Sequence, residues 1–376
     1  MKKIKALIGK AIAIVLIAAV LIVLAVLKKN QDIAEAMTRG PARWYGFAMS
    51  KVTGLVPFVS FTELLFVFLF FLAVLLLVLA IIDLVKLKVN SAICKVLDIA
   101  LVALSVITVY HFSCEAAYNR KEMPLPYYSG DVERTEYVDI YNCFANDINA
   151  CVSELEFQES GDIKAPMSLQ DVAKEVKKAY EIITDSYFAS HSGAVKPMMS
   201  SFVYREFQIT GVTFSPLAEA NIDTMIPTGD IPFTVAHELA HTKGVMREDD
   251  ANILAFYVCL NSEHPYLRFS AYNRYFSSIR PMGSGTYLTE EERSHLVAID
   301  NAFNKYYAYE YNYWKEHNLL QHIGDYINNL YIKSSGVSEG TSSYSGGTTY
   351  EYDPTAHKIT KFSSIQQLFL EKYYRA

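Results

Sequence analysis

Long apolar runs in the first third of the chain divide it into two parts. Residues 5–27 are almost wholly apolar, residues 62–82 are rich in Leu, Phe and Val, and residues 92–112 form a third, weaker run. A helix needs about 20 apolar residues to cross the hydrocarbon core of a bilayer. We therefore predict a membrane domain, residues 1–113, with three transmembrane helices, followed by a soluble domain, residues 114–376.

Two of these runs have a competing interpretation. A secretory signal peptide would have a shorter apolar core and a small-residue cleavage site, whereas the first run continues to Lys28 and Lys29. We therefore expect an uncleaved helix there. The third run has Cys94, Lys95 and Asp98 at its start, so a buried helix of the soluble domain is the alternative.

The lysines and arginines around the runs determine the expected orientation, although their counts on the two sides differ little. We adopt a cytoplasmic N-terminus, which puts the soluble domain on the extracytoplasmic side of a multi-pass protein of the cell membrane. Residues 33–55 mix Arg39, Arg43 and Trp44 with apolar residues, as is typical of a segment at the membrane interface. Glu63, at the start of the second run, is expected to cap that helix or to contact the soluble domain.

After residue 115 the chain is polar, and its pattern is mainly helical with a few extended segments. The spacing of apolar residues predicts helices over residues 138–157, 168–186, 251–261, 269–279, 289–315 and 319–333. Residues 202–214 are expected to form two strands joined by a turn, and residues 215–222 an edge strand. The expected fold class is α+β, mainly helical.

Composition agrees with this division and excludes one class of partner. Hydrophobic residues make up 51% and charged residues 20% of the chain, and the mean hydropathy is +0.13. These values are too apolar for an ordinary soluble protein and too polar for a transporter. The net charge is −6 and there is no basic stripe, so we expect no nucleic-acid partner. The five cysteines form neither a disulfide scaffold nor a zinc-ligand pattern.

The candidate chemistry lies in residues 231–254, which contain the pattern His-Glu-x-x-His. On a helix, His237 and His241 lie one turn apart on the same face, so both imidazoles can reach one metal ion. Glu238 lies beside them, where it can deprotonate a water and pass the proton to a leaving amine. Gly244 is where such a helix should end. The alternative is a helix that carries two histidines by chance.

A catalytic zinc site needs a third protein ligand and an open fourth position. The acidic cluster Glu248, Asp249 and Asp250 follows the turn and begins the next predicted helix, where acidic residues are favoured anyway. We favour Glu248, because Glu-x-x-Ala-Asn at a helix start resembles the third-ligand pattern of glutamate-type zinc peptidases. Its distance from His241 is short for that group, so Asp250 and Asp249 remain alternatives.

Two further residues are candidates for contact with a substrate or a transition state. Glu219 lies on the predicted edge strand, which would hold an extended peptide by main-chain pairing. Tyr344 lies in a loop rich in Ser and Gly, residues 336–347, where it could stabilise an oxyanion. The alternatives are an ordinary surface carboxylate and an ordinary loop tyrosine.

A series of short motifs extends along the chain around this core. They are Pro57-Phe58-x-Ser60-x-x-Glu63, Tyr118-Asn119-Arg120, Lys196-Pro197, Gly211, Glu219-Ala220-Asn221, Pro232-Phe233-Thr234, His237-Glu238-Leu239-Ala240-His241, Gly244, Glu248-Asp249-x-Ala251-Asn252, Asn328-x-x-Tyr331-x-Lys333 and Ser343-Tyr344. Their order resembles a bacterial family of membrane proteins of unknown function. The resemblance spans most of the chain and implies a membrane-anchored zinc peptidase with a zincin-like (gluzincin-like) domain. Asp250 stands where the family is expected to have Glu, which favours Glu248 as the ligand.

Together these patterns predict a membrane-anchored, zinc-dependent metallopeptidase that hydrolyses peptide bonds. Zn²⁺ would be held by His237, His241 and Glu248, with Glu238 as the catalytic base. The expected partners are the lipid bilayer and a peptide or protein substrate. The alternative is a zinc-binding membrane sensor or assembly protein of the same fold that lacks catalysis. An intramembrane protease is disfavoured, because charged residues flank the short apolar stretch around the histidines.

Overall fold

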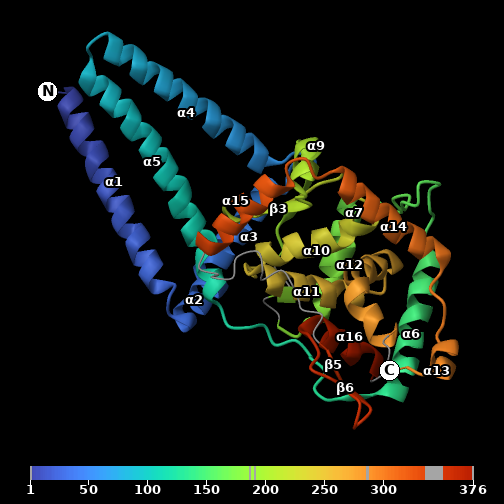
Figure 1. The fold of residues 1–376 in the computed structure, drawn as a ribbon. Coiled ribbons are helices and arrows are strands. Elements are labelled where there is room, and N and C mark those ends of the chain that lie inside the picture. The colour runs from blue at the N-terminus through green and yellow to red at the C-terminus, as the bar shows by residue number, and fades with distance from the viewer. Residues whose placement is uncertain (1, 186–187, 190–191, 285–287, 335–349, 375–376) are drawn as a thin grey trace.

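The structure, a computed structural model, describes residues 2–185, 188–189, 192–284, 288–334 and 350–374. Within these residues the protein is mainly helical, with 68% helix and two small sheets, in agreement with the predicted fold class. Figure 1 shows three long helices that extend together away from a folded part, which contains both sheets and most of the shorter helices.

The three long helices are α1 (Lys2–Leu27), α4 (Phe61–Val85) and α5 (Val89–Ser113). Their apolar stretches have mean hydropathies of 3.1, 3.5 and 2.3, and at most 6% of each stretch is buried. All three are therefore long and apolar enough to cross a membrane. Because so little of α5 is buried, the structure disfavours the alternative that the third apolar run is a buried helix of the soluble domain.

The chain between α1 and α4 folds against the later part of the protein. It contains α2 (Gln31–Met37), the π-helical turn η1 (Thr38–Ala42) and α3 (Arg43–Thr53). Glu35 on α2 accepts two hydrogen bonds of 2.9 Å from Arg120, which lower the pKa of this carboxyl to about 2. Glu35 lies before the predicted domain boundary at residue 114 and Arg120 lies after it, so this contact crosses the boundary.

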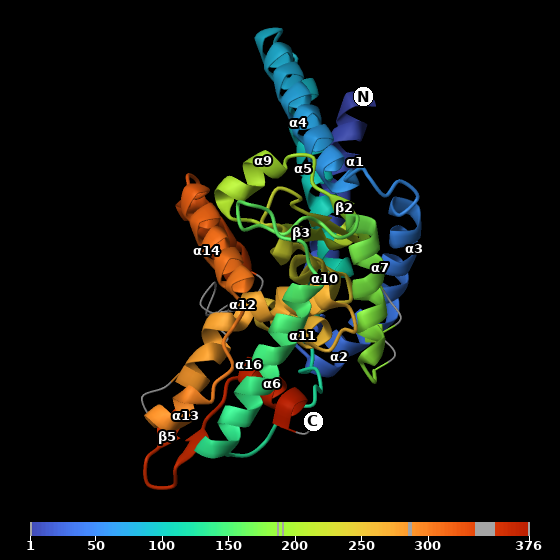
Figure 2. The same ribbon diagram turned by 90° about the vertical axis from the view of Figure 1, so that its right-hand side faces the viewer.

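Helix α10 lies near the centre of the folded part, packed by α7, α11 and α12 (Figure 2). The helices of this part are α6 (Arg134–Ser153), α7 (Leu169–Ala179), α9 (Ser201–Tyr204), α10 (Ile231–Thr242), α11 (Glu248–Leu260), α12 (Pro265–Ser284), α13 (Glu290–Ser294), α14 (Asn301–Glu316), α15 (Gln321–Ser334) and α16 (Ser364–Tyr374). On α10, Val235, Ala236, Leu239 and Ala240 are completely buried. Removal of these apolar side chains from water holds α10 in the core.

The helix predicted over residues 289–315 is interrupted. Thr289 caps α13, but residues 295–300 leave the helical conformation before α14 begins. Asn142 and Asn149 of α6 bind the backbone of this connection through hydrogen bonds of 2.8–3.0 Å. The break therefore depends on side chains about 150 residues away along the chain, which a local pattern does not reveal.

A three-stranded sheet lies against α10. Its strands are β2 (Ala194–Pro197), β4 (Glu219–Ile222) and β3 (Gly211–Phe214), in the order β2-β4-β3. β2 runs parallel to β4, and β3 runs antiparallel to it. β4 is therefore the central strand, which corrects the prediction that residues 215–222 form the edge. A second sheet joins β1 (Val132–Glu133), β6 (Lys358–Thr360) and β5 (Glu351–Asp353) in the order β1-β6-β5.

The prediction of two strands over residues 202–214 is correct only at its end. Residues 201–207 form α9 and a 3-10 turn, and residues 211–214 form β3. Phe202 is 61% exposed, so the apolar residue at this position does not reflect the buried face of a strand. Gln208, with a φ of 56°, ends the helical segment in the left-handed region.

A buried ion pair fastens the sheet to the segment that precedes α4. Lys196 of β2 and Glu219 of β4 are 0% exposed, and Nζ of the lysine lies 3.6 Å from Oε1 of the glutamate. Lys196 also donates to three backbone oxygens within residues 53–59. Glu219 accepts hydrogen bonds from the N–H and the hydroxyl of Thr62, both 2.8 Å long. Because buried charges need such partners, the sheet and the start of α4 form one unit.

The first turn of α4 makes a second contact with the folded part. The Ser60 hydroxyl accepts a hydrogen bond from the Glu63 N–H, at 3.1 Å, and so caps the helix. The Glu63 carboxylate accepts from the N–H groups of Met199 and Ser200, at 2.6 and 3.0 Å. Of the two predicted roles of Glu63, contact with the later part of the chain is confirmed.

Replacing Lys196 with Met should destabilise the full-length protein strongly, because Glu219 would remain buried without its positive partner. Breaking a buried ion pair costs about 3–5 kcal/mol, which should lower the thermal unfolding midpoint in detergent by about 10 °C. Lys164→Met is the matched control. Its pair with Glu156 is well exposed, so this change should cost less than about 1 kcal/mol. Equal midpoints for the two variants would contradict a structural role for the buried pair.

Candidate metal centre

The two histidines of the His-Glu-x-x-His pattern converge at one side of α10. Pro232 lies in the first turn of the helix, where its missing N–H costs no hydrogen bond. His237 and His241 are one turn apart, and their Nε2 atoms lie 3.0 Å from each other. The helix ends at Thr242, and Gly244, with a φ of 77°, turns the chain toward α11.

Glu248, the first residue of α11, completes the cluster. Its Oε2 atom lies 3.1 Å from Nε2 of His237 and 3.5 Å from Nε2 of His241. Within the described part of the chain, these residues form a group whose ligand atoms all lie within 4.8 Å of one another. Of the three acidic residues considered from the sequence, the structure thus brings Glu248 to the histidines.

The other two acidic residues face Arg247. The Arg247 guanidinium lies 3.0 Å from the carboxylate of Asp249 and 3.5 Å from that of Asp250. Burial and the negative charge of Asp249 raise the pKa of Asp250 to about 6. Asp249 and Asp250 therefore interact with Arg247 at the start of α11 and not with the two histidines.

The separations of the three donor atoms agree with those around a zinc ion. Zinc bonds to nitrogen and oxygen are about 2.0–2.2 Å long, so the donors of a tetrahedral site are roughly 3.3–3.5 Å apart. The observed separations of 3.0, 3.1 and 3.5 Å are close to these values. Two imidazoles and one carboxylate also leave a fourth position open. The residues present therefore fit a zinc ion.

The charges of the cluster favour a cation at its centre. The Nδ1 atom of His241 lies 2.7 Å from the Val245 oxygen, which fixes the ring with Nε2 toward Glu248. Burial lowers the pKa of His241, but the Glu248 carboxylate outweighs this and raises it to about 9. Burial alone would raise the pKa of Glu248, yet the two imidazoles lower it below its usual range. The carboxylate thus stabilises a positive charge here, whether a proton or a metal ion.

Glu238 is buried beside the cluster, and strand β3 orients its carboxylate. The Thr213 hydroxyl lies 2.7 Å from Oε2 of Glu238 and donates to it. Gly211 lies so close that a Cβ atom there would be 2.5 Å from Oε1, so a larger residue does not fit without a shift. Burial raises the pKa of Glu238 against the opposing effect of His237 and His241. A raised pKa suits a group that exchanges protons near neutral pH.

The strand beside the cluster is β3 rather than the strand predicted from the sequence. Within the described residues β3 pairs with β4 alone, so its second edge has no strand partner. Glu219, on the central strand, is 0% exposed and bonded to Thr62. It therefore has a structural role in place of the predicted contact with substrate. Tyr344, the other candidate for such a contact, lies outside the described residues.

Sequence reasoning assigned no role to Thr213, Gly211 or Val245. The importance of Thr213 depends on the packing of β3 against α10, which no local pattern encodes. Val245 acts through its backbone oxygen, so its side chain gives no signal. A glycine inside a strand does indicate the close approach of another group, and this signal could have identified Gly211.

The loop between α10 and α11 is held by residues that follow α5. Arg120 donates to the backbone oxygen of Gly244 at 2.9 Å. Met246 packs with Cys114 and Tyr118 in a small buried cluster at the end of α5. The position of Glu248 relative to the histidines therefore depends on the segment that leaves the long helices.

Residues 42–350 match the family described as protein of unknown function (DUF3810). No curated protein and no solved structure matches the chain. The matched range contains α4, α5, the β2-β4-β3 sheet and the three residues of the cluster. It agrees with the resemblance to a family of unknown function, and the family's description names no activity. Because the match covers most of the sequence, the chain belongs to the DUF3810 family.

Proposed function

We propose that the protein is a membrane-anchored, zinc-dependent metallopeptidase. The observation that carries the proposal is the convergence of His237, His241 and Glu248 beside the buried carboxylate of Glu238. Two imidazoles and one carboxylate with an open fourth position are typical of catalytic rather than structural zinc sites. The three long apolar helices support attachment to a membrane.

Each group around the cluster has its own part in the proposed reaction. Bound zinc would supply a Lewis acid that polarises a carbonyl and acidifies water. Glu238 would take a proton from the attacking water and later give it to the leaving amine as the peptide C–N bond breaks. Thr213 would hold the Glu238 carboxylate through its 2.7 Å hydrogen bond. The edge of β3 that has no strand partner among the described residues would pair with the main chain of an extended peptide.

A helix with two histidines beneath an edge strand also supports our assignment of the folded part as a zincin-like domain. We further propose that α1, α4 and α5 each cross the membrane and that the N-terminus is cytoplasmic. An odd number of spans would then put the cluster on the extracytoplasmic side.

The first test is the metal content of the full-length protein purified in detergent. We expect about one zinc per chain in the wild type, in Asp250→Ala and in Glu238→Gln, because none of these changes removes a proposed ligand. Glu248→Ala should lose most of the zinc, since it deletes one of three ligands. Mass-spectrometric metal analysis, with circular dichroism as a check on folding, measures this. A folded wild type that takes up no zinc would overturn the proposal.

The second test asks whether Glu238 is catalytic. Incubation with a mixed-sequence peptide library, followed by mass spectrometry, would reveal cleavage sites of the wild type. Glu238→Gln should reduce the cleavage rate about 10²–10⁴-fold while zinc content is unchanged, because the amide cannot accept the proton. A wild type that binds zinc but cleaves nothing, with Glu238→Gln indistinguishable from it, would favour the alternative of a non-catalytic zinc-binding sensor or assembly protein.

A third test concerns the positioning of Glu238. Thr213→Val should lower the cleavage rate about tenfold or more, because it removes a hydrogen bond to a buried carboxylate. Thr213→Ser keeps the hydroxyl and should restore most of the rate. Neither change should alter zinc content. If Thr213→Val cleaves as fast as the wild type, the hydrogen bond does not position Glu238 for catalysis.

A further inference from the structure

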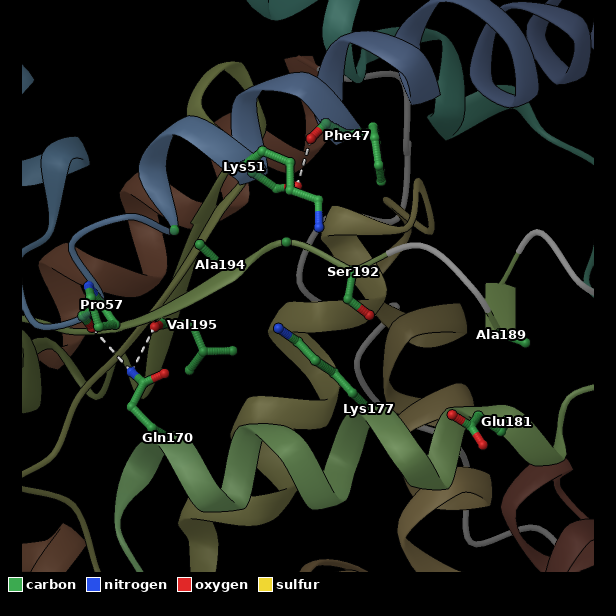
Figure 3. A pocket seen from close by; sticks show the side chains of 13 residues that line it. Phe47, Lys51, Pro57, Gln170, Lys177, Glu181, Ala189, Ser192, Ala194 and Val195 are labelled. Atoms are coloured by element: carbon green, nitrogen blue, oxygen red, sulfur yellow. Dashed lines mark hydrogen bonds between the residues drawn. The ribbon is translucent and has the colours of Figure 1, made fainter.

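A polar pocket lies between α3, α7 and the chain that leads into β2, and none of the three cluster residues lines it. Its volume is about 420 Å³, and the lining includes Phe47, Lys51, Lys177, Gln170 and Ser192. Figure 3 shows the side chains of Lys51 on α3 and Lys177 on α7 pointing toward each other across the pocket. The Gln170 amide is already engaged, because it donates to two backbone oxygens at 3.0 Å.

The two lysines lack an anionic partner within the described part of the chain. Lys51 lies over the ring of Phe47, at 5.3 Å, and neither ammonium group forms an ion pair with Glu181, a carboxylate that also lines the pocket. Burial lowers the pKa of Lys177, and the positive charge of Lys51 lowers it further. An anion between the two lysines would interact favourably with both and relieve this repulsion.

Lys178, the next residue on α7, has a different environment. It is exposed and pairs with Glu263 at 3.3 Å. Of these two neighbouring lysines on α7, Lys177 faces the pocket without an anionic partner among the described residues, whereas Lys178 has one.

The segment that carries Lys51 also exposes apolar side chains, and it lies at the base of the long helices. Trp44, Leu55 and Phe58 are 70%, 79% and 71% exposed. The rings of Tyr45 on α3 and Phe112 near the end of α5 are 5.9 Å apart. Figure 1 shows α3 beside the end of α5, on the side of the folded part from which the long helices extend. If those helices cross a membrane, α3, which carries Lys51, lies close to the membrane surface.

We propose that this pocket binds the phosphate headgroup of an anionic phospholipid. Lysine ammonium groups bind phosphate as point charges, and basic pockets beside transmembrane helices attract anionic lipids. Exposed aromatic and aliphatic side chains suit the layer in which headgroups meet acyl chains. A phosphate between Lys51 and Lys177 would supply the negative charge that the described protein residues do not. This proposal is independent of zinc and of catalysis.

The test compares lipid binding by the full-length protein in a nonionic detergent. Native mass spectrometry would count molecules of phosphatidylglycerol, or of phosphatidylcholine with the same acyl chains, retained during a titration. We expect at least tenfold tighter binding of the anionic lipid. Lys51→Gln and Lys177→Gln should each weaken it about fivefold, and the double variant about 25-fold. Lys178→Gln removes the same charge from the same helix and should change binding less than twofold.

The single Lys51 variant and a competition with inorganic phosphate separate the possible explanations of the result. Lys51 is exposed, so its replacement tests the proposal even if a change at the more buried Lys177 impairs folding. Inorganic phosphate at millimolar concentration should not displace the lipid. Equal binding of the two lipids, or a double variant that binds like the wild type, would overturn the proposal. Displacement by inorganic phosphate would also overturn it and would identify a site for free phosphate.

Discussion

The buried pair of Lys196 and Glu219 is the constraint on which the rest of the structure depends. Neither charge is exposed, and the partners that compensate them include backbone groups within residues 53–62. Glu219 lies on β4, which pairs with β3, and β3 carries Thr213, the partner of Glu238. The Glu238 carboxylate is therefore connected to the start of α4 through Thr213 of β3, through β4 and through the hydrogen bonds between Glu219 and Thr62. A shift of α4 relative to the sheet would disturb buried charges before it disturbed any loop.

A second connection reaches the cluster from the other side. Arg120 links Glu35 of α2 to the backbone oxygen of Gly244, and Met246 packs on the residues at which α5 ends. The histidines are fixed by the rigid core helix α10, whereas Glu248 follows this short loop. The position of Glu248 is thus set by contacts with the segments next to the long helices. A change in the position of the long helices relative to the folded part would therefore change the distances between Glu248 and the two histidines.

The features that the sequence predicts well are those that depend on neighbours a few residues away. The long helices follow from apolar length, and the meeting of His237 and His241 follows from one helical turn. The pattern at the start of the second helix favours Glu248, and the short turn after Gly244 brings it within 3.5 Å of both imidazoles. The failures depend on distant partners. The break within residues 289–315 is held by α6, and the burial of Glu219 depends on the pairing of three strands and on Lys196.

The same contacts decide where the domain can be divided. A chain that began at residue 114 would lack Glu35, so Arg120 would lose its carboxylate partner, and Lys196 and Glu219 would lose the backbone groups of residues 53–62. Buried charges without such compensation cost several kcal/mol, against a total stability of about 5–15 kcal/mol for an ordinary domain. The pocket would also lose Lys51 and with it half of its positive charge. The segment between α1 and α4 is thus part of the folded domain, and the cluster of His237, His241 and Glu248 is built on a framework that includes the start of α4.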